Sequence, residues 1–435
     1  MQFQCPQCKA ILASDAVTEG MKVTCHECQA VIEVKQYVKK PILRMLEEAS
    51  QAHCAEAGEN LTGSIHSKMA SAIGIEKLQG FKISDLFAEV FSKHSREEVE
   101  DYFTVGTEKS TPDITEVNAS WPKPWIFMRM VLASLAIYFL FWLGWKEFFN
   151  TKLLPGLMMI GSFAIPISTL VLFLELNVRR NVSLYMVSRL LFLGGVLSLL
   201  ITLVIGTLAD NGLLPNSGNI SQGSWLGASS AGPMEESAKV LAMVAVARAA
   251  KYKYKLNGLL VGAAVGAGFA AFESMGYALD CFTGGTLQGT IGTIINAKTE
   301  EELKFAEMNG VLAGSAEMLD NIVVRGILSP LGHIVWSAIA GCALWRVIRG
   351  QVFKWQMLCD EKFIRLLLVP VLLHMVWNSP LNLPFYGKYL IVGAAGWFVC
   401  LSLVQEGLHE IATEQAVAKK AADSNAATAA EGSEQ

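Results

Sequence analysis

The sequence predicts an all-α polytopic membrane protein with about eight transmembrane helices and a small β-rich module at its amino terminus. Hydrophobic residues make up 52% of the 435 residues and charged residues only 17%, whereas a soluble domain carries about 25% charged residues. Long apolar stretches follow one another from residue 125 onward. The formal net charge of -4 gives no support for nucleic-acid binding through bulk charge.

The amino-terminal module, residues 1–36, contains two paired-cysteine motifs. Four of the nine cysteines lie in it, as Cys5-Pro-Gln-Cys8 and Cys25-His-Glu-Cys28. This double spacing is typical of a four-cysteine zinc site, and strand-forming residues flank the second pair. A module this small needs a metal to fold, so we predict a zinc ribbon whose structural zinc is bound by Cys5, Cys8, Cys25 and Cys28. The alternative, a redox dithiol, would better fit a single CxxC in a βαβ unit.

Residues 37–124 are predicted to be a cytoplasmic, mostly helical linker region. Ser95 and Glu98 have the spacing of a capping box at the start of a short helix. Prolines then indicate an extended path into the membrane, at 112, 122 and 124. No run before the first cysteine resembles a signal peptide, so we expect the amino terminus in the reducing cytoplasm.

Residues 125–405 form the predicted transmembrane domain. A helix needs about 20 apolar residues to cross a bilayer. The candidate spans are 125–145, 153–174, 186–208, 226–248, 257–279, 327–345, 364–379 and 386–405. The fourth and seventh spans have the lowest hydropathy because polar residues interrupt them, and polar residues inside a span indicate function.

Basic residues between the spans predict the topology. Cytoplasmic loops are enriched in lysine and arginine, and such residues follow the second, fourth and sixth spans, as at Arg179, Lys251 and Arg346. Both termini are therefore expected in the cytoplasm. We expect the acidic segment 280–326 to be a long extracytoplasmic loop. Residues 406–435 are rich in Ala, Glu and Ser, which predicts a disordered cytoplasmic tail.

The fourth span contains three charged residues, Glu235, Glu236 and Lys239. Each glutamate can meet the lysine on one helix face, because the spacings are i,i+4 and i,i+3. A single structural salt bridge would leave one carboxylate over. Two neighbouring carboxylates favour a shared proton, which suits acid–base chemistry.

Three later spans carry further polar residues at helical spacing. The pairs are Glu273 with Tyr277, His333 with Trp336, and His374 with Asn378. Because successive spans alternate in direction, all of these residues are predicted to lie in the outer half of the membrane. A single site requires such a shared level, whereas unrelated structural ion pairs do not.

These side chains together favour cleavage of a bond by water. A glutamate can take a proton from a water molecule that an imidazole orients. A second imidazole and the Asn378 amide can donate to a developing oxyanion. The sequence lacks the GxSxG, HExxH and paired-aspartate motifs of other protease mechanisms.

Four motifs occur in order along these spans: Glu235-Glu236-Ser-Ala-Lys239, Phe272-Glu273 to Tyr277, His333 to Trp336, and His374 to Asn378. Over roughly residues 125–405, the chain resembles the PrsW-type intramembrane proteases. That family is similar to the type II CAAX prenyl endopeptidases, which are glutamate-dependent. The resemblance implies regulated proteolysis of membrane-embedded proteins in a bacterial inner membrane, as when a transmembrane anti-sigma factor is cut on its extracytoplasmic side.

The resemblance also implies roles for individual residues. Glu235 or Glu236 would be the base, with Glu235 favoured, and Lys239 would orient the pair or balance its charge. The other roles would be water binding by His333, oxyanion binding by His374 and Asn378, and completion of the polar network by Glu273 and Tyr277. PrsW-type enzymes have also been grouped with metalloproteases, and His333, His374 and a glutamate would provide three zinc ligands. We expect a glutamate-dependent mechanism rather than this catalytic metal.

Two other classes of function use glutamate, lysine and histidine inside a membrane. A proton-coupled transporter would relay protons through them, although no inverted repeat is visible. A catalytically silent scaffold or sensor would retain the fold, although every motif residue is present. The expected partners are a transmembrane protein substrate, the lipid bilayer and a cytoplasmic protein bound through the zinc ribbon, whereas nucleic acid is not favoured.

Overall fold

The computed structural model describes residues 2–4, 11–13, 22–24, 31–33 and 69–433, apart from residues 77, 108, 211–224, 248–250 and 296–297. The chain divides into two compact units, Met1–Met69 and Ala70–Gln435. The two units are described separately below.

The amino-terminal unit contains two antiparallel strand pairs. Strand β1 (Gln2–Gln4) pairs with β2 (Ile11–Ala13), and β3 (Lys22–Thr24) pairs with β4 (Val31–Glu33). In sequence, one CxxC motif falls between the strands of each pair. The predicted zinc ligands Cys5, Cys8, Cys25 and Cys28 lie outside the described residues, so the zinc ribbon stays a prediction.

The part of the predicted linker region 37–124 that the structure describes begins at residue 69, so the mostly helical character of the whole region stays a prediction. Besides the helical residues 69–73, it contains three short helices. These are η1 (Ile83–Leu86), α2 (Arg96–Thr104) and η2 (Ile114–Glu116). The predicted capping box at the start of α2 is confirmed. Ser95 Oγ accepts from the Glu98 N–H at 3.1 Å, and Glu98 Oε2 accepts from the Ser95 N–H at 3.0 Å.

Helices α3 (Ile126–Phe148) and α4 (Leu154–Leu176) form the first apolar hairpin, joined through η3 (Thr151–Leu153). Glu175, near the end of α4, accepts from the N–H groups of Trp125, Ile126 and Phe127 at 2.7–2.9 Å. These are donors that the start of a helix otherwise leaves unpaired. The buried carboxylate of one helix therefore fixes where its neighbour begins.

The rest of the helical unit builds a bundle around α8 and α10. Its helices are α5 (Leu184–Arg189), the π-helical η4 (Leu190–Gly194), α6 (Gly195–Asp210), α7 (Trp225–Val246), α8 (Lys255–Ile294), α9 (Glu300–Leu328), η6 (Ser329–Leu331), α10 (His333–Ile348), η7 (Trp355–Cys359), α11 (Glu361–Asn378), η8 (Pro384–Tyr386) and α12 (Gly387–Ser433). Glycines allow the central contact, because a Cβ on Gly266 would lie 2.6 Å from the His333 carbonyl oxygen.

Six helices or helix pairs in the described part of the chain are long and apolar enough to cross a membrane. They are Ile126–Phe148, Thr151–Leu176, Leu184–Ala209, Lys255–Ile294, Glu300–Ile348 and Pro384–Ala422. The other two predicted spans coincide with helices α7 and α11, which do not reach this hydropathy. These are the two helices whose charged and polar residues interrupt the apolar sequence.

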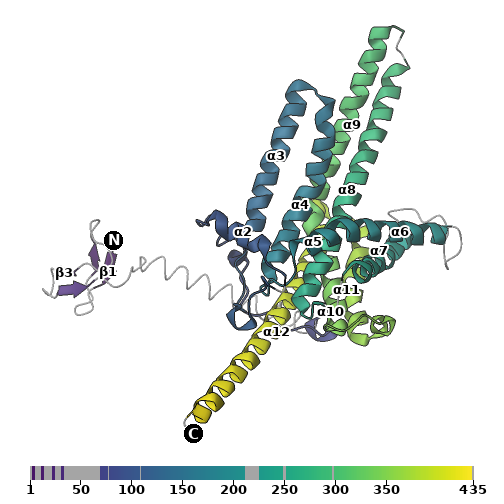
Figure 1. The fold of residues 1–435 in the computed structure, drawn as a ribbon. Coiled ribbons are helices and arrows are strands. Elements are labelled where there is room, and N and C mark those ends of the chain that lie inside the picture. The colour runs from purple at the N-terminus through teal and green to yellow at the C-terminus, as the bar shows by residue number, and fades with distance from the viewer. Residues whose placement is uncertain are drawn as a thin grey trace. The chain divides into compact units, whose positions relative to one another are not determined.

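The segment 280–326, predicted to be an extracytoplasmic loop, is helical instead, and its side of the membrane stays a prediction. This segment completes α8, which has 40 residues, and forms most of α9, which has 29. Figure 1 shows the two helices side by side, extending past the ends of α3 and α4. The acidic residues that suggested a loop, Glu300 to Glu302, form the first turn of α9, where negative charge favours a helix.

The predicted disordered tail also differs from the structure. Helix α12 continues to Ser433, and its residues beyond 405 make specific contacts. Gln415 Nε2 donates to the carbonyl oxygens of Ile114, Thr115 and Val117 at 2.7–3.2 Å. Composition alone predicted disorder because it does not reveal these partners far away in the sequence.

Candidate active site

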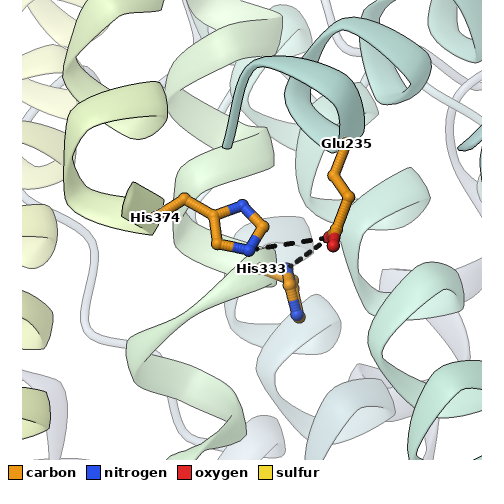
Figure 2. Close-up of side chains that lie close together, drawn as sticks. All are labelled: Glu235, His333 and His374. Carbon is orange, nitrogen blue, oxygen red and sulfur yellow. Dashed lines mark ion pairs between the residues drawn. The ribbon is translucent and has the colours of Figure 1, made fainter. Parts of the chain in front are cut away.

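Six ionisable side chains from four helices meet inside the bundle. Helix α7 contributes Glu235, Glu236 and Lys239, while α8, α10 and α11 contribute the side chains of Glu273, His333 and His374. Figure 2 shows Glu235 pointing towards both imidazoles. The spans with the predicted polar motifs therefore contribute to one cluster.

Lys239 is a fully buried member of this cluster. Its Nζ donates to Glu236 Oε1 at 2.8 Å and to His333 Nδ1 at 3.0 Å, and it lies 3.7 Å from Glu235 Oε2. The ammonium group also lies 4.1 Å from the centre of the Phe269 ring. One lysine thus faces both glutamates of α7, as their helical spacing requires.

Each histidine has one ring nitrogen next to a carboxylate. His374 Nδ1 lies 3.0 Å from Glu236 Oε1, and His333 Nε2 lies 3.2 Å from Glu273 Oε2. In a neutral imidazole, the nitrogen that faces the carboxylate carries the proton and the other nitrogen is an acceptor. The acceptors are then His374 Nε2 and His333 Nδ1, which lie 3.7 Å and 3.8 Å from Glu235 Oε2.

Two carboxylate oxygens in the cluster lack hydrogen bonds. Glu235 Oε2 and Glu236 Oε2 are buried and have no hydrogen-bond partner in the described part of the chain. Burial of a carboxylate oxygen without a hydrogen bond is unfavourable, so the ion pairs of both glutamates with Lys239 leave one oxygen of each unsatisfied. Glu235 Oε2, facing two imidazole nitrogens, is positioned to bind a water molecule, a proton or a cation.

The cluster lines a cavity of about 560 Å³. Its wall includes Glu235, Glu273, His333 and His374, together with small residues of α6 and α7 and residues from the α11–α12 connection. A cavity of this size accommodates a short stretch of extended peptide rather than a single ion. Glu236 and Lys239 lie behind this wall, where they support the exposed members of the cluster.

Comparison with known proteins identifies the family. The model of the PrsW family intramembrane metalloproteases matches residues 183–404, just over half of the 435 residues. The chain belongs to the PrsW family. No curated protein and no solved structure matches the chain. With its six apolar helices, membership of the PrsW family makes this an integral membrane protein and, at the level of the family, an intramembrane peptidase acting on a membrane protein.

The PrsW family is one of metalloproteases, and the cluster contains ligands suitable for a metal ion. One ligand atom each from Glu235, His333 and His374 lies within 4.8 Å of the others. Neighbouring ligands of a tetrahedral zinc are separated by roughly 3.3–3.6 Å, close to the 3.7 Å and 3.8 Å observed. Glu273 and Glu236 would be the carboxylates that orient zinc-bound histidines. The residues fit a metal, although Lys239 Nζ and an ion would compete for His333 Nδ1.

Tyr277 and Asn378, the other two predicted site residues, line the cavity rather than the charged cluster. Tyr277 lies beneath the Arg325 guanidinium, which is 4.4 Å from the centre of its ring. Asn378 lies one helical turn beyond His374 on α11. The catalytic roles of both residues remain predictions for this member of the PrsW family.

Sequence reasoning missed two basic residues of the cavity, Arg325 and Lys388. Arg325 Nη2 donates to Glu273 Oε2 at 2.5 Å, and its Nε donates to Ser274 Oγ at 3.0 Å. Lys388 Nζ donates to the Ser379 carbonyl oxygen at 2.8 Å. Arg325 was placed in the supposed extracytoplasmic loop, and only its charge beside an apolar segment could have indicated a role.

The level of the PrsW-family cluster is close to the middle of α4. Phe272, next to Glu273, makes an edge-on contact with Phe163 at a ring distance of 5.1 Å, and Phe163 lies near the midpoint of Leu154–Leu176. The cluster is thus deeper, relative to this helix, than the outer ends of the spans. The cavity extends from it towards the α11–α12 connection at Ser379 and Lys388.

Proposed function

We propose that the protein is an intramembrane endopeptidase in which Glu235 activates water for attack on a peptide bond. One observation carries the proposal. Glu235 Oε2 is buried without a hydrogen-bond partner in the described residues, faces a ring nitrogen of each histidine and belongs to the wall of a peptide-sized cavity. A water molecule bound there would donate to the base Glu235 and to the acceptor nitrogen of His374 at once.

In the proposed reaction, Glu235 takes a proton from the bound water while the water oxygen bonds to the carbonyl carbon. Return of that proton to the amine nitrogen accompanies cleavage of the carbon–nitrogen bond. The Nε2 of His374 is a free acceptor when its ring donates to Glu236, so this imidazole orients the water, whereas His333 Nδ1 accepts from Lys239. We therefore assign the oxyanion to the Asn378 amide instead of His374.

The remaining charged residues support these groups. Glu236 and Glu273 fix the orientation of His374 and His333, Lys239 balances the two glutamates of α7, and Arg325 balances Glu273. A zinc ion held by Glu235, His333 and His374 would supply Lewis acidity and a more acidic water. Glutamate-dependent chemistry is the version that we propose.

We propose that the substrate is a transmembrane protein, comparable to an anti-sigma factor, cut near its extracytoplasmic end. Exclusion of bulk water makes such a site suitable for a segment that unwinds inside the bilayer. The cavity supports this orientation, since it extends from the cluster to the α11–α12 connection. The positive-inside rule assigns that connection to the extracytoplasmic side.

We further propose eight membrane crossings in a bacterial inner membrane, with both termini in the cytoplasm. Helices α7 and α11 would be the two polar crossings, and α9 with α10 would form one. The basic connections after α4, α7 and α10 are consistent with this topology. The amino-terminal unit would be a cytoplasmic zinc ribbon that binds a protein partner; its two strand pairs support the ribbon fold.

The test compares new protein termini in membranes from cells that express the wild-type chain or Glu235→Gln at equal abundance. The proposal predicts termini near the outer ends of membrane spans, present only with the wild type. Identical termini in both samples, under stresses that activate the wild type and with both proteins folded, would contradict proteolysis through Glu235.

A further inference from the structure

A second charged cavity lies at the other end of the bundle, where the connections after α4, α7 and α10 meet. Its volume is about 470 Å³. Four basic residues line it, Arg179, Lys251, Lys253 and Arg349, together with the acidic residues Asp113 and Glu414. The basic side chains come from three connections far apart in sequence, so folding concentrates their charge.

The basic residues of this cavity differ from their neighbours in how they are paired. Lys253 Nζ bonds to Glu414 at 2.5 Å, and just outside the cavity Arg346 bonds to Glu406 at 2.6 Å. In contrast, Arg179, Lys251 and Arg349 form no ion pair with any residue that the structure describes. The Nε of Arg179 is also buried without a hydrogen-bond partner in the described residues.

The two carboxylates do not neutralise this charge. Glu414 is occupied by Lys253. Asp113 Oδ1 accepts from the N–H and hydroxyl of Thr115 at 2.9 Å and 2.6 Å, so it stabilises its own turn. Arg179 Nη1 donates to the Pro112 carbonyl oxygen and Arg349 Nε to the Arg346 carbonyl oxygen. Three cationic side chains around one cavity therefore have no ion-pair partner among the described residues, and their charge would attract an anion.

The position of these residues indicates what kind of anion would bind. Arg179 follows the end of α4 at Leu176, Lys251 precedes the start of α8 at Lys255, and Arg349 follows the end of α10 at Ile348. An extended chain covers at most about 3.6 Å per residue, so each lies within roughly 15 Å of the end of its helix. Long basic side chains at such positions can reach the phosphates of the lipid headgroups.

We propose that this cavity binds the headgroup phosphate of an anionic phospholipid. The guanidinium groups and the ammonium group would donate charge-assisted hydrogen bonds to the phosphate oxygens. The cavity wall includes Asp113 of the soluble segment and Glu414 of α12, so a bound lipid would connect both to the membrane helices. This proposal goes beyond proteolysis and requires only that the chain is inserted in a membrane.

The test is native mass spectrometry of the full-length protein in a nonionic detergent, titrated with phosphatidylglycerol or with zwitterionic phosphatidylcholine. We expect one phosphatidylglycerol to bind at least tenfold more tightly than phosphatidylcholine. The double variant Lys251→Gln with Arg349→Gln should lose about tenfold in phosphatidylglycerol affinity. The charge-preserving double variant Lys251→Arg with Arg349→Lys should retain most of that affinity.

The matched control is Lys354→Gln with Lys362→Gln, which removes two exposed charges that do not line the cavity. An equal loss of affinity in this control would overturn the proposal, because binding would then follow net charge. Equal affinity for the two lipids would also overturn it. Competition by inorganic phosphate at the same concentration as phosphatidylglycerol would assign the cavity to a soluble anion instead of a lipid.

Discussion

Two clusters of buried charge in the described part of the chain differ in how completely their carboxylate oxygens are hydrogen-bonded. Around Glu406 on α12, Oε1 accepts from the Glu76 N–H at 2.9 Å and from Arg346 at 2.6 Å, while Oε2 accepts from Arg346 at 2.6 Å and lies 3.3 Å from Lys255. Inside the membrane helices, Glu235 Oε2 and Glu236 Oε2 have no hydrogen-bond partner among the described residues.

This difference separates a structural charge cluster from a reactive one. The carboxylate of Glu406 is closed on both oxygens, so it holds α10, α12 and the soluble segment together and has no oxygen left for a ligand. Glu235 and Glu236 contact charged neighbours, but one oxygen of each is buried without a hydrogen bond, which is unfavourable. Such an arrangement is expected where a reactant completes the missing contacts.

The largest effect is expected from Glu235→Gln, which retains shape but removes the proposed base. Proteolysis should fall by about 10²–10⁴-fold, the usual contribution of a general base. The measurement is the rate of cleavage of a reconstituted substrate, with thermal unfolding in detergent as a check on folding. Because Glu235 Oε2 is buried without a hydrogen bond and only 3.7 Å from Lys239 Nζ, its replacement should change the unfolding temperature little.

The matched variant in the closed cluster is Glu406→Gln. It should lower the free energy of unfolding by roughly 1–3 kcal/mol, less than for a fully buried pair because Arg346 and Lys255 are partly exposed. Cleavage per folded molecule should change little. A loss of activity as large as that of Glu235→Gln, without unfolding, would remove the distinction between the two clusters.

Metal content gives the second prediction, because both the ribbon and the intramembrane cluster have suitable ligands. A glutamate-dependent enzyme should lose its bound metal when Cys5, Cys8, Cys25 and Cys28 are all replaced by serine in the full-length chain, yet still cleave substrate. The measurement is metal per protein by elemental analysis, beside activity. One equivalent of metal that survives these replacements and disappears with His374→Ala would establish a catalytic metal instead.

Most helices of the domain were predictable because long apolar stretches indicate membrane helices. The polar residues that interrupt these stretches indicated the site. The motif spacings predicted which spans contribute to the cluster. Glu235 and Lys239, for example, are four residues apart and therefore share one face of a helix. Six helices or helix pairs in the described part of the chain are apolar enough to cross a membrane, whereas eight spans were predicted. The reason is that charged and polar residues interrupt the apolar sequences of α7 and α11.

Arg325 shows what the sequence could not reveal. It lies on α9, in a segment whose acidic residues suggested a loop, and its contact with Glu273 depends on the packing of two long helices. Local composition carries no information on such a long-range contact. The same limit explains α12, whose polar residues were interpreted as disorder although Gln415 and Glu406 bind distant parts of the chain.

The third prediction tests whether Arg325 positions the open cluster. Arg325→Lys keeps the charge but cannot contact both Glu273 and Ser274 through a planar guanidinium. We expect kcat/KM to fall by about 10–100-fold, as for other residues that orient a catalytic imidazole, with a smaller change in KM. A positioning role also predicts a shifted pH profile for cleavage, whereas a purely structural role would lower stability and leave that profile unchanged.

The smallest effect is expected from adding a methyl group at the close contact between α8 and α10, next to His333. A Cβ on Gly266 would lie 2.6 Å from the His333 carbonyl oxygen, while one on Gly276 would meet nothing within 4 Å. Gly266→Ala should therefore lower the free energy of unfolding by about 1–3 kcal/mol and move His333, which would reduce cleavage. Gly276→Ala should be neutral or stabilise the helix by up to about 1 kcal/mol. Equal unfolding temperatures for the two variants would show that the cluster does not depend on the close contact between α8 and α10.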